Sequence, residues 1–246
     1  SAIIPIDVSC RIDRYNRMSV EIETPTLDQK KIGRTKLAKE ISKVCGRRFE
    51  PPMISIIKDR CRIQMSEKPV YRIQFGVAQH ACDNAQLCGD SYDCFTDGKG
   101  RFVAIISDGM GTGGRAAVDG AMASNIMGNL VKAGLGFDCA LKIVNSAMQV
   151  KSGEESLATL DVAVLDLFNG SLSVMKAGAP MSFIKKGRNV ERLDAVSVPI
   201  GILDEAKFAY AKSKLEENNW LVMVSDGVLA AGDAWIMECI EGWNEN

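Results

Sequence analysis

Residues 102–109 read Phe-Val-Ala-Ile-Ile-Ser-Asp-Gly, and residues 220–227 repeat the pattern as Trp-Leu-Val-Met-Val-Ser-Asp-Gly. Each stretch is an apolar run that ends in Ser-Asp-Gly, which is typical of a buried strand followed by a tight turn. The runs are too continuous for strands with one exposed face, so we expect both strands to be central and buried on both faces. If both lie in one core, their ends bring Asp108 and Asp226 together.

These strand ends predict a site for a divalent cation. Two carboxylates at close range repel each other unless a cation lies between them, and Mg²⁺ and Mn²⁺ prefer oxygen ligands. Glycine after each aspartate leaves room for a backbone carbonyl to reach the same ion. Asp90, in Gly89-Asp90-Ser91, begins the strand expected to pair with the Asp108 strand, so we expect a third carboxylate at the same edge. Taken alone, each aspartate also fits a turn or a helix cap.

The surrounding sequence, from about residue 70, reads as short strands interrupted by one helical pair. A loop is expected at 82–90 and helices at about 115–133 and 138–150, the second after the breakers Gly134 and Gly136. Strands are expected at 70–78, 92–95, 101–106, 162–167, 172–177, 182–185, 190–193, 208–213 and 220–224. Hairpin turns such as Asp97-Gly98-Lys99-Gly100 favour an antiparallel α+β layered fold over a parallel βαβ fold.

Residues 1–68 form a separate pattern. Two alternating runs precede a helical stretch, the breaker Pro51-Pro52 follows, and two more short strands come after it. We expect a small ββαββ unit with a regulatory or linking role, followed by a catalytic domain over 69–246.

Composition narrows the function. The chain has 246 residues, 46% of them hydrophobic and 25% charged, as in ordinary globular proteins. A net charge of −1 disfavours nucleic acid and anionic membranes as partners, and this segment contains no membrane-spanning run. One histidine, His80, excludes three-histidine zinc sites, and eight cysteines without a CxxC pattern indicate reduced cytosolic thiols.

Six short motifs occur in an order that carries a family resemblance. They are Gly89-Asp90-Ser91-Tyr92, Ile106-Ser107-Asp108-Gly109-Met110-Gly111, Ala158-Thr159-Leu160-Asp161, Ala177-Gly178-Ala179-Pro180, Pro199-Ile200-Gly201 and Val224-Ser225-Asp226-Gly227. In this order they resemble the metal-dependent (type 2C) protein serine/threonine phosphatases, most closely the bacterial branch typified by stage II sporulation protein E. The resemblance covers about residues 70–232.

The resemblance implies a β-sandwich flanked by helices that holds two Mn²⁺ or Mg²⁺ ions. By the family pattern, Asp108 bridges both ions, Asp90 and the Gly109 carbonyl bind one, and Asp226 binds the other. The catalytic residues are then Asp108 and Asp90, and a metal-activated water hydrolyses a phosphoserine without a protein nucleophile.

The resemblance also implies a partner and a place in the cell. The substrate is a phosphorylated anti-anti-sigma factor in the control of sporulation, and the segment is the cytoplasmic domain of a protein that is membrane-anchored elsewhere. The oligomeric state is left open. One departure is that the family's last metal-binding aspartate has no counterpart here, so we expect a domain without its last strand and helix. A catalytically inactive, regulatory phosphatase fold therefore stays open as an alternative.

Two further patterns offer weaker alternatives. Residues 109–114, Gly-Met-Gly-Thr-Gly-Gly, satisfy the GxGxxG pattern of dinucleotide-binding proteins, but a second helix follows where a parallel strand is required. His80, Cys82, Cys88 and Cys94 imitate a zinc cluster, although their spacing is not that of common zinc knuckles.

Overall fold

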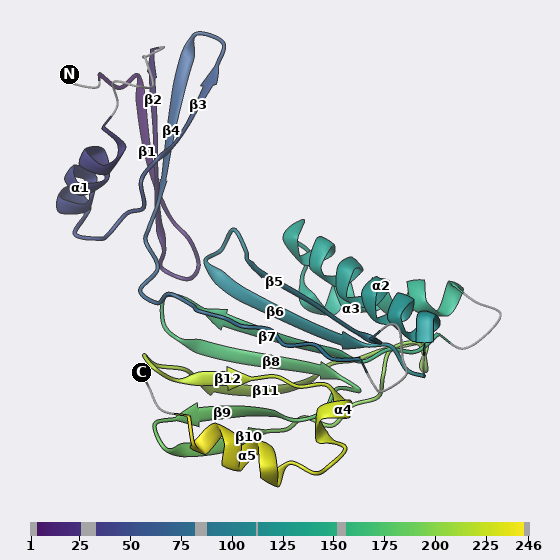
Figure 1. Cartoon of the computed structure of the whole chain (residues 1–246). Coiled ribbons are helices and arrows are strands. Elements are labelled where there is room, and N and C mark those ends of the chain that lie inside the picture. The colour runs from purple at the N-terminus through teal and green to yellow at the C-terminus, as the bar shows by residue number, and fades with distance from the viewer. Residues whose placement is uncertain (1–3, 26–32, 82–87, 112, 152–155, 244–246) are drawn as a thin grey trace. The chain divides into compact units, whose positions relative to one another are not determined.

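The computed structural model describes residues 4–25, 33–81, 88–111, 113–151 and 156–243 (Figure 1). The chain divides into two compact units, Ser1–Pro69 and Val70–Asn246. Within the described ranges, no helix has both the length and the apolar character needed to cross a lipid bilayer.

The first unit has the ββαββ order that its sequence predicts. Its elements are β1 (Asp7–Ile12), β2 (Met18–Pro25), α1 (Arg34–Cys45), β3 (Met53–Ile57) and β4 (Arg60–Ser66), and the antiparallel sheet has the order β1-β2-β4-β3. Alternation along β2 and β4 places Val20, Ile22 and Ile63 in a buried cluster with Ala38 of α1. Helix α1 ends where Gly46 adopts a left-handed conformation, as is common at helix C-termini.

The second unit is built on a five-stranded antiparallel sheet. Its strands are β5 (Asp90–Thr96), β6 (Arg101–Asp108), β7 (Leu160–Asp166), β8 (Ser171–Ala177) and β11 (Ala209–Lys214), in the order β11-β8-β7-β6-β5. The turn between β5 and β6 is held by Asp97, whose carboxylate accepts hydrogen bonds from the backbone amides of Lys99 and Arg101. This is the side-chain turn chemistry that the Asp-Gly-Lys-Gly sequence predicts.

A smaller antiparallel sheet in the second unit packs against the five-stranded sheet. It contains β9 (Ser182–Lys186), β10 (Asn189–Leu193) and β12 (Trp220–Val222), in the order β10-β9-β12. Val174 of β8 and Ile184 of β9 share one buried cluster, which lies between the two sheets. The outer face of the small sheet is covered by α5 (Ala234–Glu241), and the four-residue helix α4 (Asp226–Leu229) follows β12 (Figure 1).

Two long helices cover the other face of the five-stranded sheet. These are α2 (Gly113–Lys132) and α3 (Phe137–Val150), close to the ranges expected from the sequence (Figure 1). Their buried residues Met127 and Val144 pack with Ile105 of β6 and Val162 of β7. The second unit is therefore a β-sandwich flanked by helices, as the family resemblance implies.

The strand expected at Val70–Ala78 is wrong. No strand forms there; instead the backbone amides of Val70 and Tyr71 both donate to the Leu167 carbonyl, at 3.0 and 2.8 Å. Alternation alone does not make a strand, because a strand also needs a neighbour that supplies a ladder of hydrogen bonds.

The expectation that the 220–227 run forms a central strand is also wrong. Strand β12 lies at the edge of the smaller sheet, whereas β6 is central in the larger one. The run is apolar throughout because Leu221 packs between the sheets while Val222 packs towards α5. Cover on two faces, rather than a central position, therefore explains the continuous pattern.

Candidate metal centre

The antiparallel register brings the first two aspartates face to face. Asp90 is the first residue of β5 and Asp108 the last of β6, and the two are direct partners in the β5–β6 ladder. Residues directly opposite each other in such a pair carry their side chains on the same face of the sheet. One hairpin therefore supplies two carboxylates at one edge.

The second Ser-Asp-Gly stretch reaches the same edge. Ser225, which precedes α4, donates a hydrogen bond from its hydroxyl to a carboxylate oxygen of Asp90 at 2.9 Å. The Asp226 carboxyl lies within hydrogen-bonding reach of the Asp108 carboxyl. Although β12 and β6 belong to different sheets, the three predicted aspartates meet.

The Gly109 carbonyl lies beside this group. A Cβ atom placed on Gly89 would be 3.0 Å from an Asp108 carboxylate oxygen and 3.2 Å from the Gly109 carbonyl oxygen. The missing Gly89 side chain thus leaves a small space with two oxygen donors on its wall. Oxygen donors of this kind suit Mg²⁺ or Mn²⁺.

The carboxyl groups of this cluster are close enough together that a cation would stabilise their ionised forms. Burial first, and then the hydrogen bond with Asp226 and the negative charge of Asp90, together raise the pKa of Asp108 to about 7. A carboxyl group in this position holds a proton near neutral pH unless a cation takes its place. Among the described residues, however, no group of three or more His, Cys, Asp or Glu side chains is placed so that it could hold a metal ion by itself. Backbone carbonyls and water would have to complete the coordination.

Thr159 holds the backbone of Asp108 in place. The Asp108 amide donates to the Thr159 hydroxyl at 3.0 Å, and the Thr159 amide donates to the Asp108 carbonyl at 2.8 Å. The Ser107 hydroxyl donates to the Thr159 carbonyl at 2.7 Å. Thr159 belongs to the Ala158–Asp161 motif, but its sequence context indicates no role for its side chain.

Helix α2 packs directly on the backbone of the two loops that carry Asp90 and Asp108. A Cβ on Gly109 would lie 1.8 Å from the Ala116 carbonyl oxygen, and one on Gly120 would lie 2.3 Å from the Gly89 carbonyl oxygen. Only glycine fits at these two contacts. From the sequence alone, Gly120 is assigned no role. The signal that could have identified this contact is a glycine inside a helical pattern, which often marks a close packing contact.

The weaker sequence alternatives find no support in this geometry. Strand β7, which follows the helical pair, runs antiparallel to β6, whereas a dinucleotide-binding unit requires parallel strands. The Cys88 thiol donates to the His80 carbonyl and to an Asp90 carboxylate oxygen, both at 3.6 Å. The fourth residue of this weaker zinc alternative, Cys82, lies outside the described residues.

Comparisons with known proteins agree with this fold. The chain has, over its full length, the fold of a solved structure of the PP2C phosphatase domain and a fragment of the regulatory domain of SpoIIE from Bacillus subtilis. The TM-score is 0.72 at 23% identity, and the match covers 74% of that structure. The RsbU and RsbW domains of Rv1364c from Mycobacterium tuberculosis match 65% of the chain with a TM-score of 0.58 at 21% identity, over 48% of that structure. The fold is therefore that of a type 2C protein phosphatase domain.

The family follows from the sequence comparison. The profile described as stage II sporulation protein E (SpoIIE) matches residues 98–238, and the chain belongs to this family. Stage II sporulation protein E of Bacillus subtilis (strain 168) is 31% identical over 182 residues, which is 72% of this chain and 22% of the relative. Its namesake from Priestia megaterium is 30% identical over 168 residues, 68% of this chain and 29% of the relative. The chain thus spans less than a third of the length of these relatives.

Proposed function

We propose that the second unit is a protein serine phosphatase whose carboxylate cluster holds two Mn²⁺ or Mg²⁺ ions. The single observation that carries this proposal is the meeting of Asp90, Asp108 and Asp226 at one edge, beside the Gly109 carbonyl. A protein of similar fold, RsbX, has been solved in complex with magnesium, with a TM-score of 0.54 at 14% identity. That likeness supports the fold of the site, and the oxygen donors support the kind of ion.

Each residue has a role in this proposal. Asp108 would contact both ions, Asp90 and the Gly109 carbonyl one of them, and Asp226 the other. When bound, the ions supply positive charge for the phosphoryl oxygens and lower the pKa of a water that attacks phosphorus. The chain itself orients these donors, since Ser225 fixes one oxygen of Asp90 and Thr159 fixes the backbone of Asp108.

The test is Mn²⁺-dependent hydrolysis of a phosphoserine protein by the chain and by an Asp108→Asn variant. We expect the unmodified chain to be active only with Mn²⁺ or Mg²⁺, and the variant to lose about 1000-fold or more, since one bridging ligand disappears. Asp97→Asn is the matched control, because Asp97 lies in the turn at the opposite end of the β5–β6 hairpin. An unmodified chain that binds the ions without turnover would favour the inactive regulatory module.

The proposal extends to the partner and to the place in the cell. The substrate class is a phosphorylated anti-anti-sigma factor, and the domain lies in the cytoplasm as part of a longer, membrane-anchored protein that takes part in sporulation. Family membership and the sporulation names of the two relatives support this extension. A panel of phosphoserine proteins, together with membrane fractionation of the full-length protein, tests it; equal rates on unrelated phosphoproteins would contradict the substrate.

The first unit enters the proposal as a regulatory segment that acts on the phosphatase unit. It supplies none of the carboxylates of the site, and it forms a compact unit of its own. Deleting residues 1–68 should leave a chain that binds Mn²⁺ but is regulated differently.

A further inference from the structure

A fully buried ion pair lies inside the second unit, and neither of its residues is among the proposed ligands of the metal centre. The Lys176 ammonium group on β8 donates to an Asp161 carboxylate oxygen on β7 at 2.6 Å and to the Ser182 hydroxyl on β9 at 2.8 Å. The Ser182 hydroxyl donates to the same Asp161 oxygen at 3.1 Å. The side chains of Lys176 and Asp161 are 0% and 2% exposed, so the pair is removed from water.

Stability is a weak explanation for this pair. Desolvating two charges costs about as much as their attraction returns, and apolar residues of the same volume often do as well. Here the other carboxylate oxygen of Asp161 is buried, and no group of the described residues donates a hydrogen bond to it. A pair placed only for stability would satisfy both oxygens.

The register places the pair next to the metal centre. Asp161 is the direct partner of Ile106 on β6 and of Lys176 on β8. Asp108 lies two residues beyond Ile106, on the same face of the sheet, because side chains alternate along a strand. Asp161 is therefore a diagonal neighbour of Asp108, at about 7–8 Å between Cα atoms. The face they share is the one that meets the smaller sheet, since Ser182 of that sheet completes the cluster.

We propose that the Asp161–Lys176 pair sets the cation affinity of the metal centre, because Asp161 neutralises the positive charge of Lys176 beside Asp108. This proposal rests on the function proposed above. Between two packed sheets charges are screened less than in water, so a unit charge one or two strands away from Asp108 acts on a divalent cation bound there. As a pair, Asp161 and Lys176 present no net charge. If Asp161 were removed, the Lys176 cation would stand alone and oppose metal binding. Asp161 therefore acts by compensating the charge of Lys176, without contacting the ions itself.

The test is a charge-rescue experiment with Mn²⁺ binding measured by calorimetry. Asp161→Asn should weaken Mn²⁺ binding about tenfold, because it leaves an unpaired cation near Asp108. Asp161→Asn combined with Lys176→Met removes both charges and should return the Kd to within about twofold of the unmodified chain. A double variant that binds Mn²⁺ as weakly as Asp161→Asn, or a single variant with an unchanged Kd, would overturn the proposal. If the unmodified chain binds no Mn²⁺, the proposed function fails as well.

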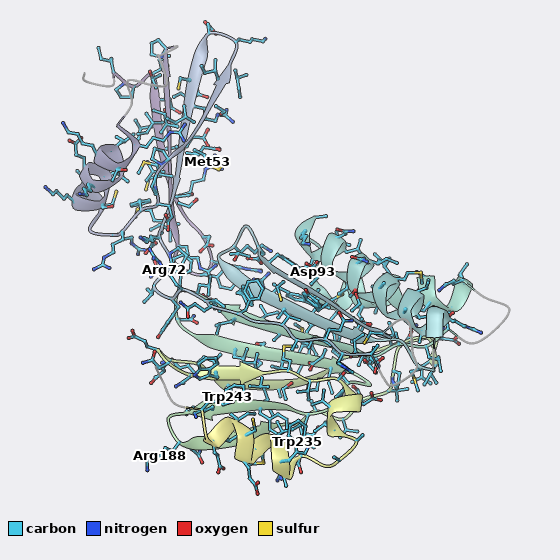
Figure 2. The ribbon with its side chains drawn as sticks, in the orientation of Figure 1. Met53, Arg72, Asp93, Arg188, Trp235 and Trp243 are labelled. Carbon is cyan, nitrogen blue, oxygen red and sulfur yellow. The ribbon has the colours of Figure 1, made fainter. Side chains whose placement is uncertain are left out.

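The matched control is an Asp–Lys pair on the other face of the same sheet. Asp93 of β5 accepts a hydrogen bond from Lys132 of α2 at 2.6 Å. Figure 2 labels Asp93, which lies on the side of the sheet that the helices cover. Asp93→Asn, and the same change with Lys132→Met, should leave the Kd within about twofold, since this pair is partly exposed and screened. Equal effects at both pairs would show that long-range charge, rather than this particular pair, controls binding.

A measurement without mutation covers the case in which Asp161→Asn does not fold. The ammonium nitrogen signal of Lys176 should shift when diamagnetic Mg²⁺ is added to the labelled chain. Lys185 serves as the internal reference, because its buried ammonium group donates to the Ile240 carbonyl at 2.7 Å instead of to a carboxylate. A Lys176 signal that stays fixed while the Asp108 amide signal moves would show that the metal binds without sensing the pair, and would overturn the proposal.

Discussion

The two units use the same plan, an antiparallel sheet with a helical cover on one face, but they treat the second face differently. In the first unit that face carries a ladder of charged side chains, in which Arg62 contacts Glu21 and Glu23 at 3.0 and 3.2 Å. In the second unit the corresponding face meets another sheet and is apolar around Val174 and Ile184. This difference in surroundings determines the direction in which the pKa of a carboxyl group shifts on each sheet.

The pKa values of two acidic groups show the consequence. Hydrogen bonds from Arg62 and Arg60 lower the pKa of Glu23 in the first unit. Burial raises the pKa of Asp108 in the second unit to about 7. On the water-facing sheet, arginine neighbours stabilise the ionised carboxylate. Between two sheets, burial disfavours the ionised form, so the carboxyl group is stable only with a bound proton or a nearby cation. The second face, rather than the residue type, therefore accounts for the opposite pKa shifts of Glu23 and Asp108.

The largest expected effect comes from disturbing the contact between α2 and the site. Gly109→Ala places a methyl group 1.8 Å from the Ala116 carbonyl oxygen, so the Asp108–Gly109 turn or the helix must move. We expect phosphatase activity to fall about 100-fold or more, because a displacement of about 1 Å at a catalytic group costs that much. Gly98→Ala is the control, since it meets no atom within 4 Å. Full activity of the Gly109 variant would contradict the packing described here.

The next effect tests whether the two units are independent. Ile63→Ala removes a fully buried side chain from the core of the first unit and should destabilise that unit by about 2–5 kcal/mol. The second unit should keep its unfolding transition and its Mn²⁺ affinity. Denaturant titration followed by circular dichroism separates the two transitions. A single transition that shifts as a whole would show that the units unfold together.

The pH dependence of stability should have opposite signs in the two units. The folded pKa of Asp108, about 7, lies above its reference value of 3.8. The metal-free second unit should therefore lose stability as the pH rises from about 4 to 7, and Mg²⁺ should restore it. The pKa of Glu23 lies below its reference value of 4.5, so its contribution is present above that pH and is lost on acidification.

Chemical denaturation in EDTA at pH 5 and pH 8 measures these signs, with Asp108→Asn as the control. The control should show a smaller loss of stability between the two pH values. A second unit that becomes more stable towards pH 8 without metal, in parallel with the control, would refute the assignment to Asp108.

The smallest effect is expected in the charged ladder of the first unit. Arg62→Met removes contacts to Glu21 and Glu23 that are partly open to solvent. Such pairs contribute little, so the melting temperature of the first unit should fall by only about 2–4 °C, and less in high salt. Calorimetric scans at low and high ionic strength measure this shift. A loss as large as that of Ile63→Ala would mean that the ladder, and not the apolar core, holds the unit.

Local patterns predicted most of the elements. The turn at Asp97-Gly98-Lys99-Gly100 specified the β5–β6 hairpin, and the breakers around Gly134 and Gly136 separated α2 from α3. The strand expected at Val70–Ala78 failed, since alternation there found no partner strand. Local signals are strong where a turn and its two flanks agree, and weak where pairing depends on a distant segment.

The sequence predicted that the aspartates of the candidate site lie together, but it did not predict which residues hold them in place by hydrogen bonds. Asp90 and Asp108 belong to one hairpin, so the register that brings them together follows from nearby residues. Ser225 lies 135 residues from Asp90, and Thr159 lies 51 residues from Asp108. Serine and threonine hydroxyls have many local uses, and nothing in their own neighbourhood distinguishes these two.

The sequence by itself determined which residues can bind a hard cation, which turns join the strands, and which family the ordered motifs resemble. These properties are local, because they depend on the chemistry of a few adjacent residues. Only the tertiary structure decided that the second Ser-Asp-Gly stretch follows an edge strand of a different sheet, and that Asp161 and Lys176 meet beside Asp108. The physical reason is that packing one sheet on another joins residues distant in the chain and removes them from water, which gives their charges the strength to act on one another.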